Sequence, residues 1–139
     1  MDQEVKSPRT PRFEEYLAGA FFGYTLSILP IYIITYLFQV YSIDPSSLDP
    51  ISLYLLFITP FFFGGAIAGY LVVRRSEIDH WKVGIKAGIG CLILMGLLMG
   101  LVEGRPANPL ALATVFLGCT FSGYLYGRKY QKKIKTQNK

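Results

Sequence analysis

The sequence has few charged residues and few of the side chains that carry catalysis. Only 17% of its 139 residues are charged, whereas 52% are hydrophobic, and a soluble domain carries roughly 25% charged residues. The sequence has only one histidine. Its two cysteines are too few for a disulfide-rich scaffold. The high hydrophobicity excludes an intrinsically disordered chain. The composition therefore indicates one small domain embedded in a membrane.

Charge is missing entirely from four long stretches, at residues 16–43, 50–73, 87–102 and 106–127. A helix needs about 20 apolar residues to cross the hydrocarbon core. The third stretch is shorter, and it spans if Lys86 extends its amine to the headgroups. The sequence thus predicts an all-α fold, a compact bundle of four transmembrane helices. The predicted spans are about 14–40, 50–73, 83–102 and 108–127, within a domain of residues 13–128.

The expected helix starts share one local pattern, a capping side chain followed by proline at the first helical position. Two other prolines, Pro30 and Pro60, lie inside spans, where the lost backbone hydrogen bond predicts a bend. The three capping pairs are Thr10-Pro11, Asp49-Pro50 and Asn108-Pro109.

The basic residues predict the orientation of the bundle. Of the 14 lysines and arginines, only Arg105 falls in the loops on one side. We expect the protein in the plasma membrane, and the positive-inside rule then places both termini in the cytoplasm. Residues 1–12 form a basic N-terminal arm and residues 129–139 a basic tail. The net charge of +5 then reflects topology and contact with anionic lipid, and nucleic-acid binding is not expected. The residues expected at this lipid surface include Arg74, Arg75, Lys82, Lys86, Arg128 and Lys129.

Glycines are concentrated in the spans, and every predicted helix has a pair spaced by four residues. In membranes such pairs let helix backbones approach closely. We favour packing within one bundle, and the alternative is a surface for oligomerisation. The glycines assigned to helix packing are Gly19, Gly23, Gly64, Gly65, Gly69, Gly84, Gly88, Gly96, Gly100, Gly118, Gly123 and Gly127.

The second and fourth spans resemble each other. Residues 62–75 match residues 116–129 at an offset of 54, with six identities that include two glycines, a Tyr-Leu pair and an arginine. The match suggests two duplicated hairpins related by an axis along the membrane normal. The alternative is that Gly, Tyr and a terminal Arg recur in any such segment.

The stretch from Gly64 to Gly100 resembles small four-helix membrane proteins of unknown function, mainly archaeal. In these proteins a G-G-x-x-A-G-Y-like helix precedes a polar turn and a G-x-x-x-G helix. The resemblance implies the same kind of fold. It implies no activity, because none is known for those proteins.

The single histidine, His80, falls in the polar loop between the second and third spans. We interpret it as a solvated loop residue, since a metal site needs three or four ligands. Glu77 and Asp79 are interpreted as solvated loop charges, and Trp81 as an interfacial anchor. The sequence predicts no metal site and no cofactor.

The two cysteines, Cys91 and Cys119, are expected at similar depth on antiparallel neighbouring helices. Buried structural cysteines are the commoner case. A ligand pair or a redox pair is the alternative.

Five hydroxyl groups fall within one arc of the first span, opposite Gly19, Ala20, Gly23, Ser27 and Pro30. We favour interhelical hydrogen bonds and interfacial tyrosine for them. A polar groove, a headgroup site or a partner helix is the alternative. The five residues are Tyr24, Thr25, Tyr32, Thr35 and Tyr36.

The sequence contains no nucleophile paired with a base, and no ionisable residue deep in a span. The first absence argues against an enzyme, and the second against proton-coupled transport. We therefore expect an accessory, assembly or scaffold subunit that packs through glycine faces against another membrane protein. The alternative is a homo-oligomeric pore or facilitator for a small solute or ion.

Overall fold

The fold consists of four long helices joined by short connections. A computed structural model describes residues 8–104 and 106–137. The helices are α1 (Phe13–Val40), α2 (Pro50–Val73), α3 (His80–Glu103) and α4 (Pro109–Gln137), with one short 3₁₀ turn, η1 (Pro45–Ser47). Each of the four is long and apolar enough to cross a membrane. The predicted four-helix membrane fold is confirmed.

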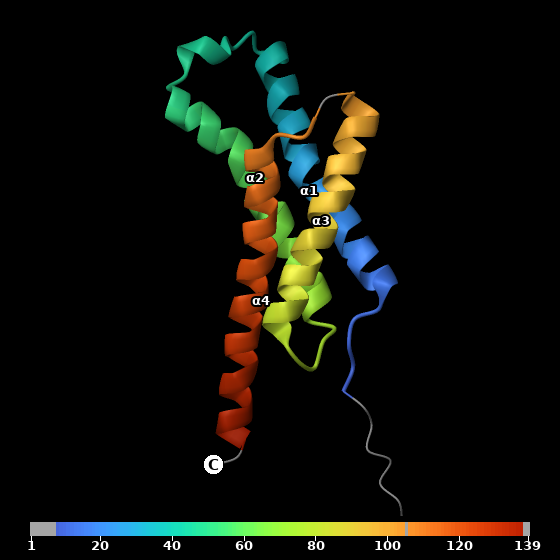
Figure 1. Cartoon of the computed structure of the whole chain (residues 1–139). Helices are drawn as coiled ribbons and strands as arrows, with labels where there is room; N and C mark the ends of the chain where they lie inside the picture. Colours follow the sequence, from blue (N-terminus) through green and yellow to red (C-terminus); the bar gives the residue numbers. More distant parts are fainter. Residues whose placement is uncertain (1–7, 105, 138–139) are drawn as a thin grey trace, which may run out of the picture.

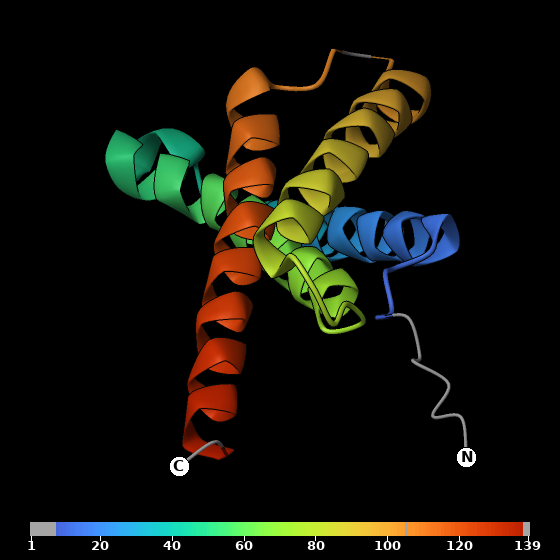
Figure 2. The same ribbon diagram turned by 60° about the horizontal axis from the view of Figure 1, so that its bottom comes forward.

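The helices pack as two hairpins, α1 with α2 and α3 with α4. The hairpins meet mainly where α2 lies along α4, and α3 also contacts both α1 and α2. Figures 1 and 2 show that α3 and α4 are close near the start of α3 and diverge toward Glu103. The end of the bundle with the 74–79 connection, the start of α1 and the end of α4 is called the basic end here. The other end, with the connections 41–49 and 104–108, is called the loop end.

Two helix starts follow the predicted capping pattern. The Asp49 carboxylate accepts a hydrogen bond from the Ser52 N–H at 3.1 Å, and the Asn108 side-chain oxygen accepts one from the Leu110 N–H at 2.9 Å. In the same connection as Asp49, hydrogen bonds from the hydroxyl and the N–H of Ser46 hold the pKa of Asp44 below its ordinary value. These acidic side chains therefore form turns and caps, as expected.

The start of α1 differs from the prediction at Thr10-Pro11. The N-cap is Arg12, and α1 begins at Phe13. The carboxylate of Glu15 accepts a hydrogen bond from the Arg12 N–H at 3.0 Å. A glutamate at the third helical position satisfies the N-cap amide in this way, which moves the helix start beyond the proline.

Two helices are longer than their predicted spans. α3 begins at His80 rather than at residue 83, after Asp79 with a φ of 49°. α4 continues through the basic tail to Gln137, where the sequence analysis ended the span at residue 127. α1 and α2 remain helical through Pro30 and Pro60.

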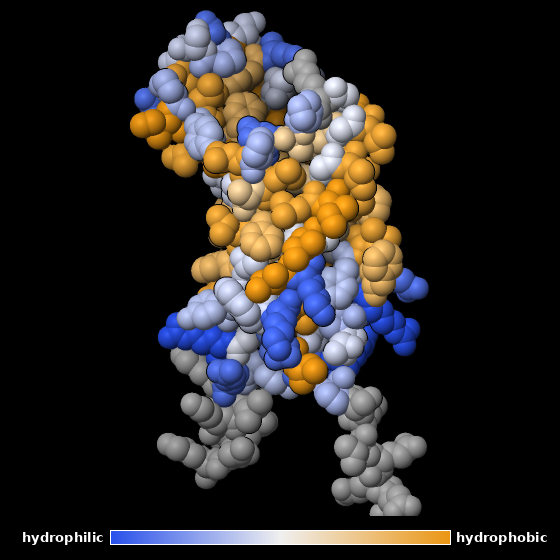
Figure 3. All heavy atoms as spheres, viewed as in Figure 1, coloured by the Kyte–Doolittle hydropathy of each residue, from blue (hydrophilic) through white to orange (hydrophobic). Residues whose placement is uncertain are grey.

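The interior of the bundle consists mostly of small and medium side chains, with Phe61 as a larger one. One buried cluster contains Phe61, Ala68, Met95, Val115 and Cys119. Many large apolar side chains lie instead on the outside. On the face that Figure 3 shows, hydrophobic residues cover the middle of the molecule and hydrophilic ones gather toward both ends. This inversion is what a lipid environment favours, since lipid solvates apolar side chains and helices associate by close packing.

Candidate functional site

The glycines of the α1/α2 hairpin lie at the contact between the two helices. A Cβ atom added to Gly23 would lie 2.8 Å from the Ala68 Cβ and 3.3 Å from the Gly64 carbonyl oxygen. One turn further along α1, Ser27 is fully buried and donates a hydrogen bond to the Gly23 carbonyl oxygen at 2.7 Å. The side of α1 opposite the hydroxyl arc is therefore the side that packs against α2 here.

The closest backbone approach joins α2 to α4, where a Cβ atom on Gly65 would overlap the Val115 backbone and one on Gly118 would overlap the Phe62 backbone. A Cβ atom on Gly69 would lie 2.7 Å from both the Cα and the carbonyl oxygen of Cys119. The thiol of Cys119 lies 3.1 Å from the Gly65 carbonyl oxygen, and these two positions are equivalent in the predicted repeat. A side chain larger than hydrogen at Gly69 would thus force α2 and α4 apart at this crossing. The duplication itself stays a prediction.

The first turn of α3 packs against the glycines of α4. An added Cβ atom would lie 2.9 Å from the His80 carbonyl oxygen at Gly123, and 3.3 Å from the His80 Cβ at Gly127. On the α3 side, a Cβ atom on Gly84 would lie 3.0 Å from the Gly123 Cα. Gly84 of α3 and the pair Gly123 and Gly127 of α4 therefore belong to one interface between the two helices.

Gly96 and Gly100 of α3 differ from these internal glycines. A Cβ atom at either position would meet nothing within 4 Å. The glycine ridge of α3 packs on α4 at Gly84 and Gly88, but a row of four-residue steps turns by about 40° per step around the helix, and the two helices also diverge. Gly96 and Gly100 therefore lie away from α4. These two glycines, together with Ile93 on the same side of α3, which is 60% exposed, are here called the open face of α3.

A groove of about 430 Å³ opens between the hairpins in the half of the bundle nearer the loop end. Its polar side chains come from helix segments near the loop end, and its apolar residues reach the middle of α1 and α2. This arrangement suits an amphiphile or a polar solute that enters from the loop end. The polar residues are Tyr32, Thr35, Tyr54 and Asn108; the deeper apolar ones include Ile28, Phe61, Met99 and Ala111.

The structure divides the predicted hydroxyl arc of α1. Tyr32 and Thr35 line the groove, whereas Tyr36 is exposed and Tyr24 packs against the core. The hydroxyls of Thr25 and Thr35 donate to the carbonyl oxygens of the residues four positions earlier in α1, at 3.0 and 2.9 Å. These two bonds are thus intrahelical, not the interhelical ones expected. The five residues point in a similar direction around the axis of α1 but are spread over several helical turns. Their side chains therefore reach different surroundings.

His80 is not the solvated loop residue that the sequence suggested. Its residue is only 8% exposed, and its ring lies 5.2 Å from the Tyr126 ring and 4.9 Å from the Tyr130 ring. Its Nε2 is buried and has no hydrogen-bond partner among the residues that the structure describes. The imidazole is buried because Gly123 and Gly127 leave room for the first turn of α3. The glycine spacing in α4 was the available signal for this contact.

Charged residues at the basic end form a few ion pairs. Glu15 pairs with Arg9 at 2.8 Å and with Arg75 at 3.5 Å, and Asp79 pairs with Lys82 at 3.1 Å. Glu77 is exposed and exchanges two hydrogen bonds with the backbone of Arg9. The other basic residues predicted at the lipid surface, Arg74, Lys86, Arg128 and Lys129, are also exposed.

A second hollow, of about 540 Å³, lies at the basic end beside the start of α3. It is lined by His80, Trp81, Tyr124 and Arg128, among others. The Trp81 and Tyr124 rings meet edge to face at 6.1 Å, and Trp81 is half exposed. The mixture of aromatic and basic side chains is typical of a headgroup region.

The two cysteines meet in the core, as their matching depths predicted. Their sulfur atoms lie 3.7 Å apart, and both residues are buried. Across residues 8–104 and 106–137, no three or more His, Cys, Asp and Glu residues come together as a metal site. Comparison of the chain with protein-family models, curated proteins and solved structures finds no match.

Proposed function

We propose that the protein is a non-catalytic membrane subunit that joins another membrane protein through the open face of α3. In this proposal it lies in the plasma membrane with the basic end in the cytoplasm, in line with the distribution of its 14 lysines and arginines. The observation that carries the proposal is the pair Gly96 and Gly100, at which an added Cβ would meet nothing within 4 Å.

The contrast with the internal glycines supports this assignment. Gly69, Gly84, Gly88 and Gly123 are occupied by contacts inside the bundle, so their small size is explained by folding. Gly96 and Gly100 serve no such internal contact. Small residues facing lipid permit a second helix to approach closely, and a helix of a partner protein would use this face.

The internal contacts also change the test that the sequence alone suggests. Leucine at Gly69 or Gly123 would break the bundle itself, so loss of a partner would be uninformative. The informative change is Gly96→Leu with Gly100→Leu. The matched control is Gly90→Leu, because Gly90 also faces open space but lies on a different side of α3.

The experiment is purification of the tagged protein at native abundance in mild detergent, followed by native mass spectrometry. We expect a stoichiometric second membrane protein with the wild type and with Gly90→Leu, and its loss with the double variant. Retention of the partner by the double variant, or its loss from both, would contradict the proposed face.

The groove supports a second candidate, a homo-oligomeric facilitator for a small solute or ion. Tyr32 and Thr35 line its polar part, but its deep residues stop at Phe61, Met99 and Ala111. A path across the membrane would need a rearrangement or a second copy. This candidate predicts flux into liposomes that contain the purified protein alone, weakened by Tyr32→Phe with Thr35→Val. Absence of flux across a broad solute panel would exclude it.

A further inference from the structure

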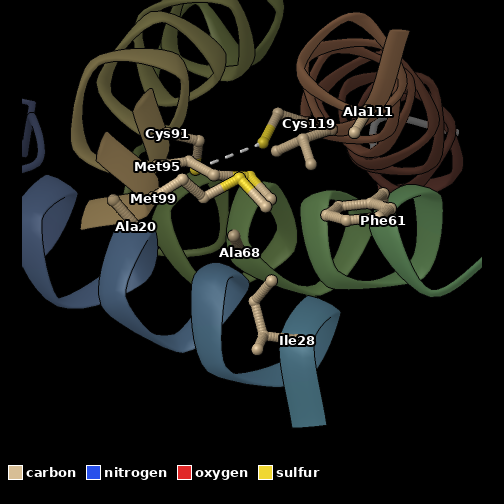
Figure 4. Close-up of a cluster of buried hydrophobic side chains, with 10 residues drawn as sticks. Ala20, Ile28, Phe61, Ala68, Cys91, Met95, Met99, Ala111 and Cys119 are labelled. Atoms are coloured by element: carbon tan, nitrogen blue, oxygen red, sulfur yellow. Dashed lines mark hydrogen bonds between the residues drawn. The ribbon is translucent and has the colours of Figure 1, made fainter. Parts of the chain in front are cut away.

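Four sulfur-containing side chains gather in the middle of the bundle, and they are called the sulfur cluster here. Cys91, Met95 and Met99 come from α3, and Cys119 comes from α4. Each is at least nine-tenths buried, with exposed fractions from 0% to 8%. Figure 4 shows all four projecting into the interior between the helices, with the two thiols joined by the 3.7 Å contact.

The spacing of the three α3 residues brings their sulfurs to one face. Steps of four residues keep side chains on one side of a helix, and long helical side chains lean toward the N-terminus. The Met95 thioether therefore leans toward Cys91, and that of Met99 toward Met95. Cys119 completes the group from the facing helix.

Two thiols and two thioethers are soft donors, the kind that selects Cu(I). Two sulfurs that share one metal ion at about 2.3 Å each lie about 3.8 Å apart at a tetrahedral angle and about 4.6 Å apart when linear. The observed sulfur separation of 3.7 Å is within about 0.1 Å of the tetrahedral value. We propose that Cys91, Cys119 and Met95 form a buried binding site for one Cu(I) ion, and that Met99, about two helical turns from Cys91, lies at the entrance to this site.

Charge balance favours a monovalent ion here. When Cu(I) binds, one thiol releases its proton to solvent, a sulfur–copper bond forms, and no electron is transferred. One thiolate and Cu(I) together are neutral, and a neutral unit avoids the cost of an unbalanced charge in an apolar interior. The Cys119 thiol contacts both the Gly65 carbonyl oxygen and the Cys91 sulfur, so the proton leaves from Cys91. The remaining thiol and the Met95 thioether add as neutral donors.

Met99 connects the cluster to the groove, because it belongs to both. An ion that enters from the loop end meets the Met99 thioether first, then Met95 and Cys91. Cys91 is the last sulfur residue of the row. Beyond it the packing leaves no path, since a Cβ atom on Gly88 would already lie 2.7 Å from the Phe116 ring. The geometry is that of a binding site reached from one side. It does not depend on the partner contact proposed above.

The test is anaerobic titration of the full-length reduced protein in detergent with Cu(I), buffered by a chromophoric Cu(I) chelator. We expect one Cu(I) and one released proton per chain, with only sulfur neighbours in the copper X-ray absorption spectrum. Zn(II), a harder ion, should compete poorly. The expected loss of affinity is on the order of 100-fold for Cys91→Ser and on the order of 10-fold for Met95→Leu, which keeps the side-chain volume. The control Leu97→Ala changes an exposed residue of α3 and should bind like the wild type.

Several results would overturn the proposal. One is failure of the folded, reduced wild type to retain Cu(I) against the chelator. Another is unchanged affinity in a folded Cys91→Ser, Cys119→Ser double variant, with helicity checked by circular dichroism. A third is oxidation of the two thiols to a disulfide in protein that binds no Cu(I), which would identify a redox pair instead. Loss of the partner in the Gly96 and Gly100 variants leaves all these readouts unaffected.

Discussion

The substitution Gly69→Ala tests the contact between α2 and α4. The added Cβ would lie 2.7 Å from the Cα and the carbonyl oxygen of Cys119, whereas carbon atoms pack best at about 3.5 to 4.0 Å. The two helices must therefore move apart by roughly 1 Å locally. Overpacking of this kind costs about 1 to 3 kcal/mol, which corresponds to about a 5- to 150-fold shift of the folding equilibrium.

The matched control for this prediction is Gly96→Ala. An added methyl group there meets nothing within 4 Å, so we expect stability within about 0.5 kcal/mol of the wild type. Unfolding is measured in mixed micelles by titration with a denaturing detergent, followed by far-ultraviolet circular dichroism and by fluorescence of Trp81, the only tryptophan. The reasoning is refuted if Gly69→Ala is as stable as the wild type, or if both variants lose equal stability.

Two other predictions use the same titration. His80→Phe keeps a ring between Tyr126 and Tyr130 and removes the unpartnered Nε2, so stability should change by less than about 1 kcal/mol, whereas His80→Ala should cost about 2 kcal/mol or more. Equal losses in both would show that the ring packing is unimportant. Asp49→Ala removes the cap on the Ser52 N–H and should cost about 1 kcal/mol; no loss would contradict the role of this cap.

The sequence was sufficient for the features that depend on local chemistry. Charge-free runs predicted the four helices because lipid tolerates few charges, and Asp49 and Asn108 marked two starts because their side chains bond to amides a few residues away. The depth of Cys91 and Cys119 followed from counting residues from the expected helix ends. These inferences require only neighbours in sequence or the regular rise of a helix.

Other features depend on contacts between distant residues, which local patterns do not reveal. His80 is buried by Tyr126 and Tyr130 from α4, so its loop-like neighbours were misleading. All the glycine pairs look alike in sequence, yet the direction and divergence of α3 leave Gly96 and Gly100 open, while Met95 and Met99 at the same level are buried. The sulfur cluster joins methionines to cysteines, and a search for His, Cys, Asp and Glu ligands does not find it.

The most direct test of the proposed function is photo-crosslinking from the open face of α3 in native membranes. A photoreactive amino acid replaces Ile93, which is 60% exposed, and in a control protein it replaces Leu29 of α1, which is 53% exposed. We predict a crosslinked product with one distinct membrane protein from position 93 and none from position 29. Products with lipid alone from both positions would contradict the account, and a product of twice the chain mass would replace the accessory subunit with a homo-oligomer.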